Sequence, residues 1–171
     1  VGHTDAVTGV VVSNDGRIAV SASQDQTLRV WDLDAGIDLF TLRGHTEPIN
    51  VLRISTASDY VVSGAGTAIR SSDNTLRVWR VAQGRELVTL SGHRARVSAV
   101  AIAPDDNCIA SGSDDGTLKI WDCMTGQELR TLRGHAGSIA AIAWLLDGQY
   151  IVSVAVDGKM YVWRRESGTI V

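Results

Sequence analysis

Histidine, serine and aspartate recur at fixed spacing along this chain, and these are the residue types of a hydrolytic catalytic triad. A Gly-His pair occurs four times, and a serine follows each histidine by 18 residues. An aspartate precedes a tryptophan by six residues in each of the same four stretches. The four histidines also suggest a second kind of chemistry, zinc binding, because imidazole is a common zinc ligand. The sixteen positions are His3, Ser21, Asp25, Trp31; His45, Ser63, Asp73, Trp79; His93, Ser111, Asp115, Trp121; and His135, Ser153, Asp157, Trp163.

Four-fold repetition argues against both chemistries. A catalytic group is needed once, and its nucleophile must be open to substrate. Here each serine ends a short apolar run that we expect to be a buried strand. Histidines one repeat apart do not converge on a single point, as zinc requires. We therefore expect no catalytic residue, no metal and no cofactor, and we interpret each set of four side chains as a structural tetrad.

The spacing defines a repeat. The histidines are separated by 42, 48 and 42 residues, and six extra residues of the second repeat lie between Ser63 and Asp73, in the stretch GAGTAIRSS. Each repeat contains short runs rich in β-branched residues, such as IAVS and TLRVW, bounded by polar turn residues. Such runs predict four strands per repeat, and no segment shows a convincing helical period.

These residues resemble the WD-repeat (WD40) family, and the resemblance covers essentially the whole chain. It implies an all-β fold, a β-propeller of four-stranded antiparallel blades set radially about a channel. It also implies that indole, serine, imidazole and aspartate form a hydrogen-bonded chain in each blade. The expected blades are roughly residues 1–42, 43–90, 91–132 and 133–171 of one WD40 region, 1–171. The family's final Trp-Asp stands at Trp31-Asp32 and Trp121-Asp122, whereas Trp79-Arg80 and Trp163-Arg164 depart from it.

Four blades lie at the bottom of the usual range of about four to eight, and about seven is most common in the family. The chain begins at Val1-Gly2-His3 and stops at Thr169-Ile170-Val171, partway into an expected fourth strand. We expect a segment of a longer propeller, with a closed four-bladed ring as the alternative. In an open arc the first and last blades would expose apolar faces that favour self-association.

Composition limits the class of partner. The chain has 171 residues, of which 44% are hydrophobic and 20% charged, with a net charge of −3. These values fit a globular protein and disfavour nucleic acid or an anionic membrane as partner. No apolar run reaches the roughly 20 residues that span a bilayer. Two cysteines are few for a disulfide-built secreted fold, so we expect a cytoplasmic location, with the nucleus as the alternative.

The loops are the expected site of function, because a rigid scaffold positions them. The Gly-His loops and the turns between second and third strands should share one face. We expect a non-catalytic scaffold that binds proteins or peptides at this face and at the channel mouth, with no small-molecule substrate. The alternatives are the sensor region of a signalling NTPase and the substrate receptor of a ubiquitin ligase. Candidate partner-binding residues are Arg70, Arg94, Arg96, Asp5, Glu47, Gln24 and Ser138.

Three of these candidates are arginines that could gather if their blades are neighbours. Arg70 lies in the insertion, and Arg94 and Arg96 lie in the next Gly-His loop. Guanidinium groups suit bidentate recognition of carboxylate or phosphate. The other interpretation is three separate, solvated side chains.

Overall fold

The structure is a computed structural model that describes residues 2–69 and 71–171. It is built of β-strands, with one short 3-10 turn, η1 (Val81–Gln83). The first two blades contain β1 (Val7–Val12), β2 (Ile18–Ser23), β3 (Thr27–Asp32), β4 (Ile37–Arg43), β5 (Ile49–Ile54), β6 (Tyr60–Ala65), β7 (Leu76–Arg80) and β8 (Arg85–Leu90). The other two contain β9 (Val97–Ile102), β10 (Cys108–Ser113), β11 (Leu118–Asp122), β12 (Glu128–Leu132), β13 (Ile139–Trp144), β14 (Tyr150–Ala155) and β15 (Met160–Arg164).

The strands form four separate antiparallel sheets, one for each sequence repeat, as the expected propeller blades require. Strand order follows the chain in every blade: β1-β2-β3-β4, β5-β6-β7-β8, β9-β10-β11-β12 and β13-β14-β15. The fourth blade has three strands, and Ile170 pairs with Trp163 in an isolated bridge beside β15. The prediction of an all-β fold of propeller blades is confirmed.

The second strands of the two middle blades lie in the interior of the stack. All six residues of β6 and all six of β10 are buried, which explains their runs of small and β-branched side chains. Gly64 of β6 lets the blades approach closely. A Cβ at this position would lie 2.7 Å from methyl carbons of Val51 and Val97, one in its own blade and one in the next.

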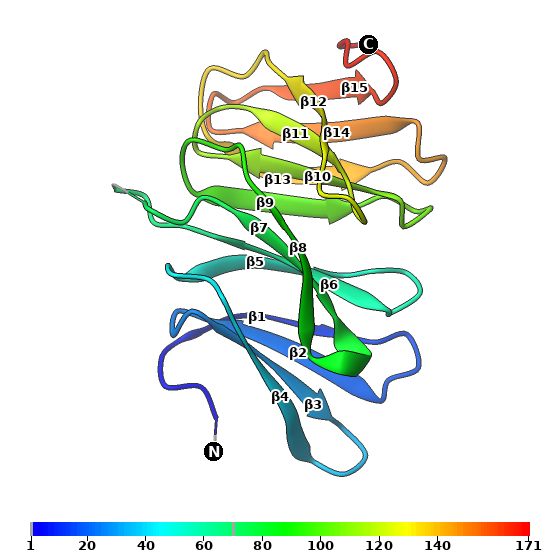
Figure 1. The fold of residues 1–171 in the computed structure, drawn as a ribbon. Helices are drawn as coiled ribbons and strands as arrows, with labels where there is room; N and C mark the ends of the chain where they lie inside the picture. The colour runs from blue at the N-terminus through cyan, green and yellow to red at the C-terminus, as the bar shows by residue number, and fades with distance from the viewer. Residues whose placement is uncertain (1, 70) are drawn as a thin grey trace.

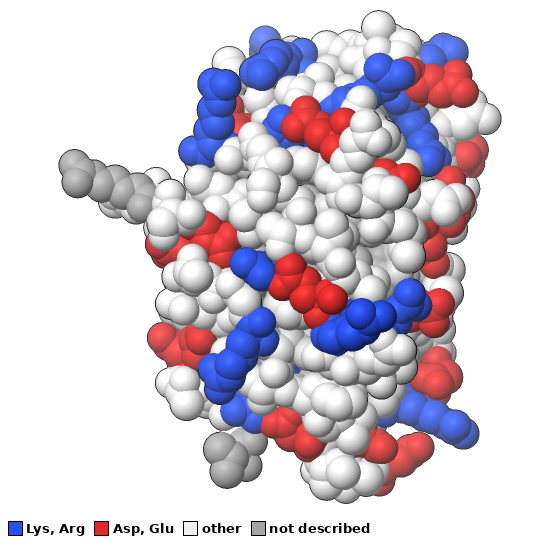
Figure 2. All heavy atoms as spheres, in the orientation of Figure 1, with Lys and Arg blue, Asp and Glu red and all other residues white. Residues whose placement is uncertain are grey.

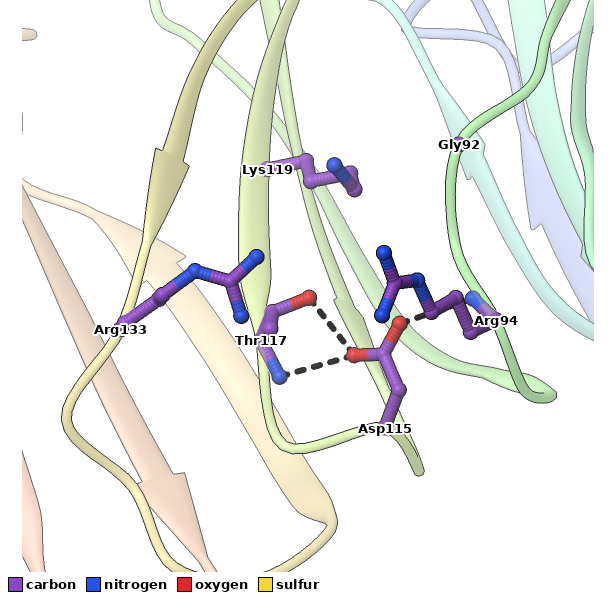
Figure 3. A pocket seen from close by; sticks show the side chains of 6 residues that line it. All are labelled: Gly92, Arg94, Asp115, Thr117, Lys119 and Arg133. Carbon is purple, nitrogen blue, oxygen red and sulfur yellow. Dashed lines mark hydrogen bonds between the residues drawn. The ribbon is translucent and has the colours of Figure 1, made fainter.

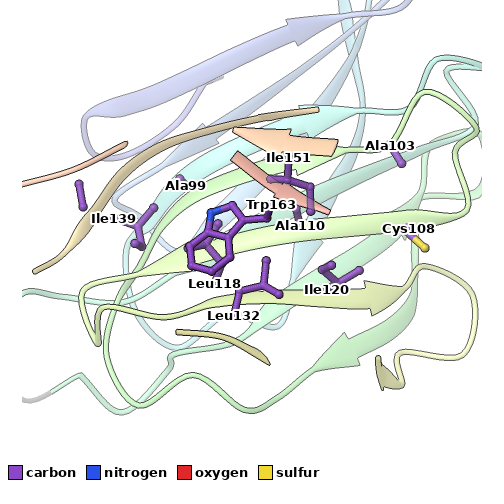
Figure 4. Packing of buried hydrophobic residues seen from close by; sticks show 11 residues of the cluster. Ala99, Ala103, Cys108, Ala110, Leu118, Ile120, Leu132, Ile139, Ile151 and Trp163 are labelled. Atoms are coloured by element: carbon purple, nitrogen blue, oxygen red, sulfur yellow. The ribbon is translucent and has the colours of Figure 1, made fainter. Parts of the chain in front are cut away.

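Three apolar clusters join consecutive blades, and a tetrad tryptophan belongs to each. Trp79 packs with residues of the first two blades, and Trp121 with residues of the second and third. Figure 4 shows the third cluster, where Trp163 lies against Leu118 and Leu132 of the preceding blade. Trp31 in the first blade belongs to none of the three clusters and is only partly buried.

The blades stack in an open arc. The first strands of successive blades contact one another, β1 with β5, β5 with β9, and β9 with β13. The first and last blades lie at opposite ends of the molecule (Figure 1). The alternative of a closed four-bladed ring is therefore wrong. Within residues 2–69 and 71–171, no helix has the length and apolar character needed to cross a bilayer.

Candidate functional site

The second blade shows how a tetrad is connected. Trp79 Nε1 donates to Ser63 Oγ at 2.9 Å, and Ser63 Oγ lies 2.8 Å from His45 Nε2. His45 Nδ1 lies 2.9 Å from a carboxylate oxygen of Asp73. Because a carboxylate accepts, Nδ1 carries the proton and Nε2 accepts from the serine hydroxyl. All four side chains are buried, and the chain of bonds satisfies their polar atoms.

The same connections occur in every blade. Tryptophan-to-serine distances are 2.8–2.9 Å and histidine-to-serine distances are 2.7–2.8 Å. Histidine-to-aspartate distances are 2.9–3.3 Å. The four serine side chains are buried and already hydrogen-bonded on both sides. A substrate carbonyl cannot reach them, so the arrangement acts as a clamp and not as a nucleophile with its base.

Each tetrad aspartate also ties down the loop that carries its histidine. Asp73 accepts from the backbone N–H of Thr46, at 2.9 Å, and from the hydroxyl of Thr75, at 2.6 Å. Burial alone would raise the pKa of Asp73, but hydrogen bonds from His45, Thr75 and Thr46 outweigh burial and hold that pKa below its ordinary value. The carboxylate therefore stays charged at neutral pH. The pKa values of Asp25 and Asp115 are lowered in the same way.

We call the Gly-His loops (residues 2–6, 44–48, 91–96 and 133–138) and the turns between second and third strands (24–26, 66–75, 114–117 and 156–159) the loop face. In every blade a backbone N–H of the turn donates to a carbonyl of the Gly-His loop, at 2.9–3.1 Å. The loop face is thus held to the blades by both side-chain and backbone bonds. The bonded pairs are Gln24 to Ala6, Gly66 to Pro48, Asp114 to Arg96, and Val156 to Ser138.

Most of the candidate binding residues lie on the loop face as separate groups. Asp5 and Gln24 are exposed in the first blade. Glu47 accepts from the hydroxyl of Ser72 at 2.9 Å, which links the Gly-His loop of the second blade to the inserted segment. Ser138 is half-buried in the fourth blade.

The three candidate arginines differ in their surroundings. Arg70 lies outside the described residues. Arg96 is half-buried, and its Nε donates to Asp114 Oδ2 at 2.9 Å within its own blade. Arg94 is exposed and lies beside Lys119 and Arg133, two residues that were not among the candidates.

A pocket of about 120 Å³ opens on the loop face of the third blade. In Figure 3 the side chains of Arg94 and Arg133 lie on opposite sides of the pocket, with Lys119 above and Asp115 with Thr117 below in this view. Arg94 lies in the Gly-His loop and Lys119 in β11, and Arg133 directly follows β12. The residues that line the pocket are Gly92, Arg94, Asp115, Thr117, Lys119 and Arg133.

Strand pairing creates this pocket. Leu118 of β11 pairs with Leu132 of β12, which sets Thr117 across from Arg133. The pattern LRGH, which contains Arg133, and the pattern TLKIW, which contains Lys119, are both visible in the sequence. Their convergence could have been predicted by aligning the third and fourth strands of one blade. The positions that recur in all four repeats do not show it.

Lys119 is buried, and its ammonium group has hydrogen-bond partners within its own blade. Its Nζ donates to Glu128 Oε2 at 2.7 Å and to Thr131 Oγ1 at 2.8 Å. Burial alone would raise the pKa of Glu128, but the hydrogen bonds from Lys119 and Thr131 outweigh burial and lower that pKa. Elsewhere in the described residues, no three metal-binding side chains gather, and both cysteines, Cys108 and Cys123, are buried and unpaired.

Comparison with known proteins places these features in a family. The family described as "WD domain, G-beta repeat" matches residues 1–32, 36–80, 84–122 and 126–164. Among solved structures, the crystal structure of the computationally designed Ika4 protein is similar, with a TM-score of 0.83 and 36% identity. That similarity covers 95% of this chain and 93% of the designed chain.

Curated relatives match over shorter stretches. The E3 ubiquitin-protein ligase COP1 of Arabidopsis thaliana is 38% identical over 66 residues, 39% of this chain and 10% of that protein. The small ribosomal subunit protein RACK1 of Schizosaccharomyces pombe is 35% identical over 69 residues, 40% of this chain and 22% of that protein. The matched stretches thus span less than a quarter of these relatives.

Proposed function

The chain belongs to the WD40 repeat family, and from this premise we propose that it is a non-catalytic scaffold that binds proteins or peptides through its loop face. The proposal rests on two sets of hydrogen bonds that hold that face in place. Tetrad bonds and backbone bonds fix both loops of each blade, while side chains such as Asp5, Gln24 and Arg94 remain exposed. A rigid, polar surface of this kind is suited to recognition because little order is lost on binding.

The relatives support a role within larger assemblies. COP1 is named as a ubiquitin-protein ligase and RACK1 as a ribosomal subunit protein. Of the two specific settings expected from the sequence, the similarity to COP1 favours the substrate receptor of a ubiquitin ligase over the sensor of a signalling NTPase. The four tetrad serines are buried, which agrees with a binding role.

Affinity capture with matched surface variants tests the proposal. The loop-face variant is Asp5→Lys with Glu47→Lys, and the control is Asp34→Lys with Glu166→Lys, which makes the same change of charge at exposed sites away from that face. Each captured protein is then purified and its affinity for all three forms measured. We expect the loop-face variant to lose binding at least about tenfold and the control to keep it. Equal binding by all three forms, or loss in the control alone, would exclude the loop face as the partner site.

A further inference from the structure

We propose that the pocket between Arg94 and Arg133 binds the phosphate group of a phosphorylated side chain on a protein partner. This inference rests on the proposed scaffold function and names the chemistry that one part of the loop face recognises. The pocket brings three cationic side chains from three different segments to one opening of about 120 Å³ (Figure 3). Guanidinium forks and an ammonium group are the side chains that bind phosphate oxygens in proteins.

The two arginines are available to a ligand. Both are exposed, and in residues 2–69 and 71–171 no carboxylate forms an ion pair with either of them. Of the carboxylates nearby, Asp114 pairs with Arg96 and Glu128 pairs with Lys119. Asp115 remains a carboxylate inside the pocket, where it accepts hydrogen bonds from the blade.

Lys119 adds a directed donor. Its ammonium has three N–H groups, and the bonds to Glu128 and Thr131 use two of them. Lys119 as a whole is 7% exposed and lines the pocket, and these two bonds leave one N–H for a further acceptor. A buried ammonium gains more from an anion than an exposed one because solvent screens it less.

Asp115 is the one carboxylate inside the pocket, and its oxygens are occupied. It accepts from the backbone N–H groups of Arg94 and Thr117, at 2.9 and 2.8 Å, and from the hydroxyl of Thr117 at 2.6 Å. Its second oxygen also lies 3.3 Å from His93 Nδ1. These hydrogen bonds hold both oxygens of Asp115 toward the blade, and its single charge is exceeded by those of Arg94 and Arg133 at the pocket.

Only the third blade carries three cations at these positions. A point of positive charge fits one phosphate monoester, whose charge of about −1.5 to −2 is shared by three oxygens. Nucleic acid would need a row of such contacts, and on the face in view in Figure 2 the basic and acidic side chains are intermixed. The positions that match Arg94, Lys119 and Arg133 hold Thr4, Arg29 and Arg43; Thr46, Arg77 and Ser91; and Ala136 and Tyr161.

Nuclear magnetic resonance of the full chain tests the proposal directly. The probes are a Gly-Gly-Ser-Gly-Gly peptide with the serine phosphorylated, the same peptide unmodified, its glutamate version, and inorganic phosphate. We expect the phosphorylated peptide to shift the Nε–H signals of Arg94 and Arg133 in a saturable way. The unmodified peptide should shift neither signal, and the glutamate peptide should bind at least about tenfold more weakly.

Variants assign the binding to the pocket. Arg94→Ala and Arg133→Ala should each weaken the phosphorylated peptide at least about tenfold, because each removes charge-assisted hydrogen bonds. Arg43→Ala, at the position in the first blade that matches Arg133, should leave binding unchanged. Full affinity in both pocket variants, or equal affinity of the glutamate peptide, would overturn the proposal. So would inorganic phosphate that binds as tightly as the phosphorylated peptide, since the site would then belong to the free ion.

The two proposals can fail separately. If captured partners still depend on the loop face while no phosphorylated probe binds, the scaffold function stands and the phosphate site is wrong. If the loop-face variant leaves every captured partner bound, the scaffold proposal fails, and the peptide titration then reports on the pocket alone.

Discussion

At the scale of single residues, the tetrad explains why histidine and serine recur without serving as catalysts. Each histidine uses both ring nitrogens, one toward a serine and one toward an aspartate. Each serine oxygen receives an indole N–H and lies against an imidazole nitrogen. No polar atom of the set is left over for chemistry. Removing any member would leave its partners buried and unsatisfied.

Trp121→Ala should lower the free energy of unfolding by about 3–5 kcal/mol, because it removes a buried aromatic side chain and strands the hydroxyl of Ser111. His93→Ala should lower it by about 1–3 kcal/mol. Urea denaturation measures both. Leu146→Ala, at a side chain that is 96% exposed, is the control and should change the value by less than about 0.5 kcal/mol. If the tetrad variants also lowered the free energy of unfolding by less than about 0.5 kcal/mol, the tetrad would not be a stabilising network.

The tetrad aspartates should make the fold sensitive to acid. Their pKa values are lower in the folded chain than the value of about 3.9 in an unfolded one. As pH falls, the unfolded chain takes up protons first, so this contribution is complete well above pH 4 and declines below it. Urea denaturation between pH 7 and pH 3 should show that decline. Asp115→Asn should reduce its slope, whereas Asp34→Asn, at an exposed site, should keep it; equal slopes in all three would refute the assignment.

At the scale of elements, the inserted segment of the second blade leaves its strands undisturbed. β6 and β7 pair in the same register as β10 and β11, with Gly64 opposite Leu76 as Gly112 is opposite Leu118. The described part of the loop between them, residues 66–69 and 71–75, reaches the edge of the molecule (Figure 1), and Ile69 in it is 81% exposed. The segment therefore extends a turn that the other blades close with fewer residues.

Deletion of residues 67–72 should change the free energy of unfolding by less than about 1 kcal/mol. Loop length has a small entropic cost, and the deletion joins Gly66 to Asp73 as Gln24 joins Asp25 in the first blade. Asn74 would then have to adopt the left-handed conformation that Gln26 and Gly116 adopt, which asparagine tolerates. Thermal and urea melts provide the measurement. A loss of several kcal/mol would show that the loop packs as part of the blade.

Strands and tetrads could be predicted from the sequence because both follow from local residue patterns that repeat along the chain. The serine keeps its spacing from the histidine, and the aspartate keeps its spacing from the tryptophan, in all four repeats. Ser63 and Asp73 can therefore be assigned to one tetrad even across six extra residues. The basic pocket could not be predicted from these recurring positions, because it depends on strand pairing that brings Arg133 beside Thr117. The pairing of Arg96 with Asp114 was likewise hidden, since it joins a loop and a turn 18 residues apart.

At the scale of the whole molecule, the two end faces carry the residue types that join blades inside the stack. Val7 and Val10 of β1 are 57% and 64% exposed, whereas Ile49 and Leu52 at the matching positions of β5 are buried. The outer face of the last blade presents an apolar hollow lined by Ala141, Ile142, Ala143, Val152 and Val154. Such faces favour contact with another sheet of the same kind.

The isolated chain should therefore self-associate. Light scattering should report species heavier than the 18.3 kDa of one chain, and Val10→Asp or Ala143→Asp should shift them toward the monomer. Leu146→Asp, in the turn after β13 and at a comparably apolar exposed site, is the matched control and should leave association unchanged. A monodisperse monomer of the unaltered chain that melts cooperatively would contradict the prediction.

Each tetrad closes within its own blade, and the three apolar clusters join consecutive blades. The chain is consequently a nearly one-dimensional array, in which stability is a sum of repeat terms and nearest-neighbour terms. A duplication or loss of one whole repeat in the gene would recreate the same kind of apolar junction elsewhere in the array and leave the tetrads of the remaining blades intact. Proteins of this construction can thus change length in steps of one repeat, and a binding pocket confined to a single blade, as that of Arg94 and Arg133 is, would be carried along intact.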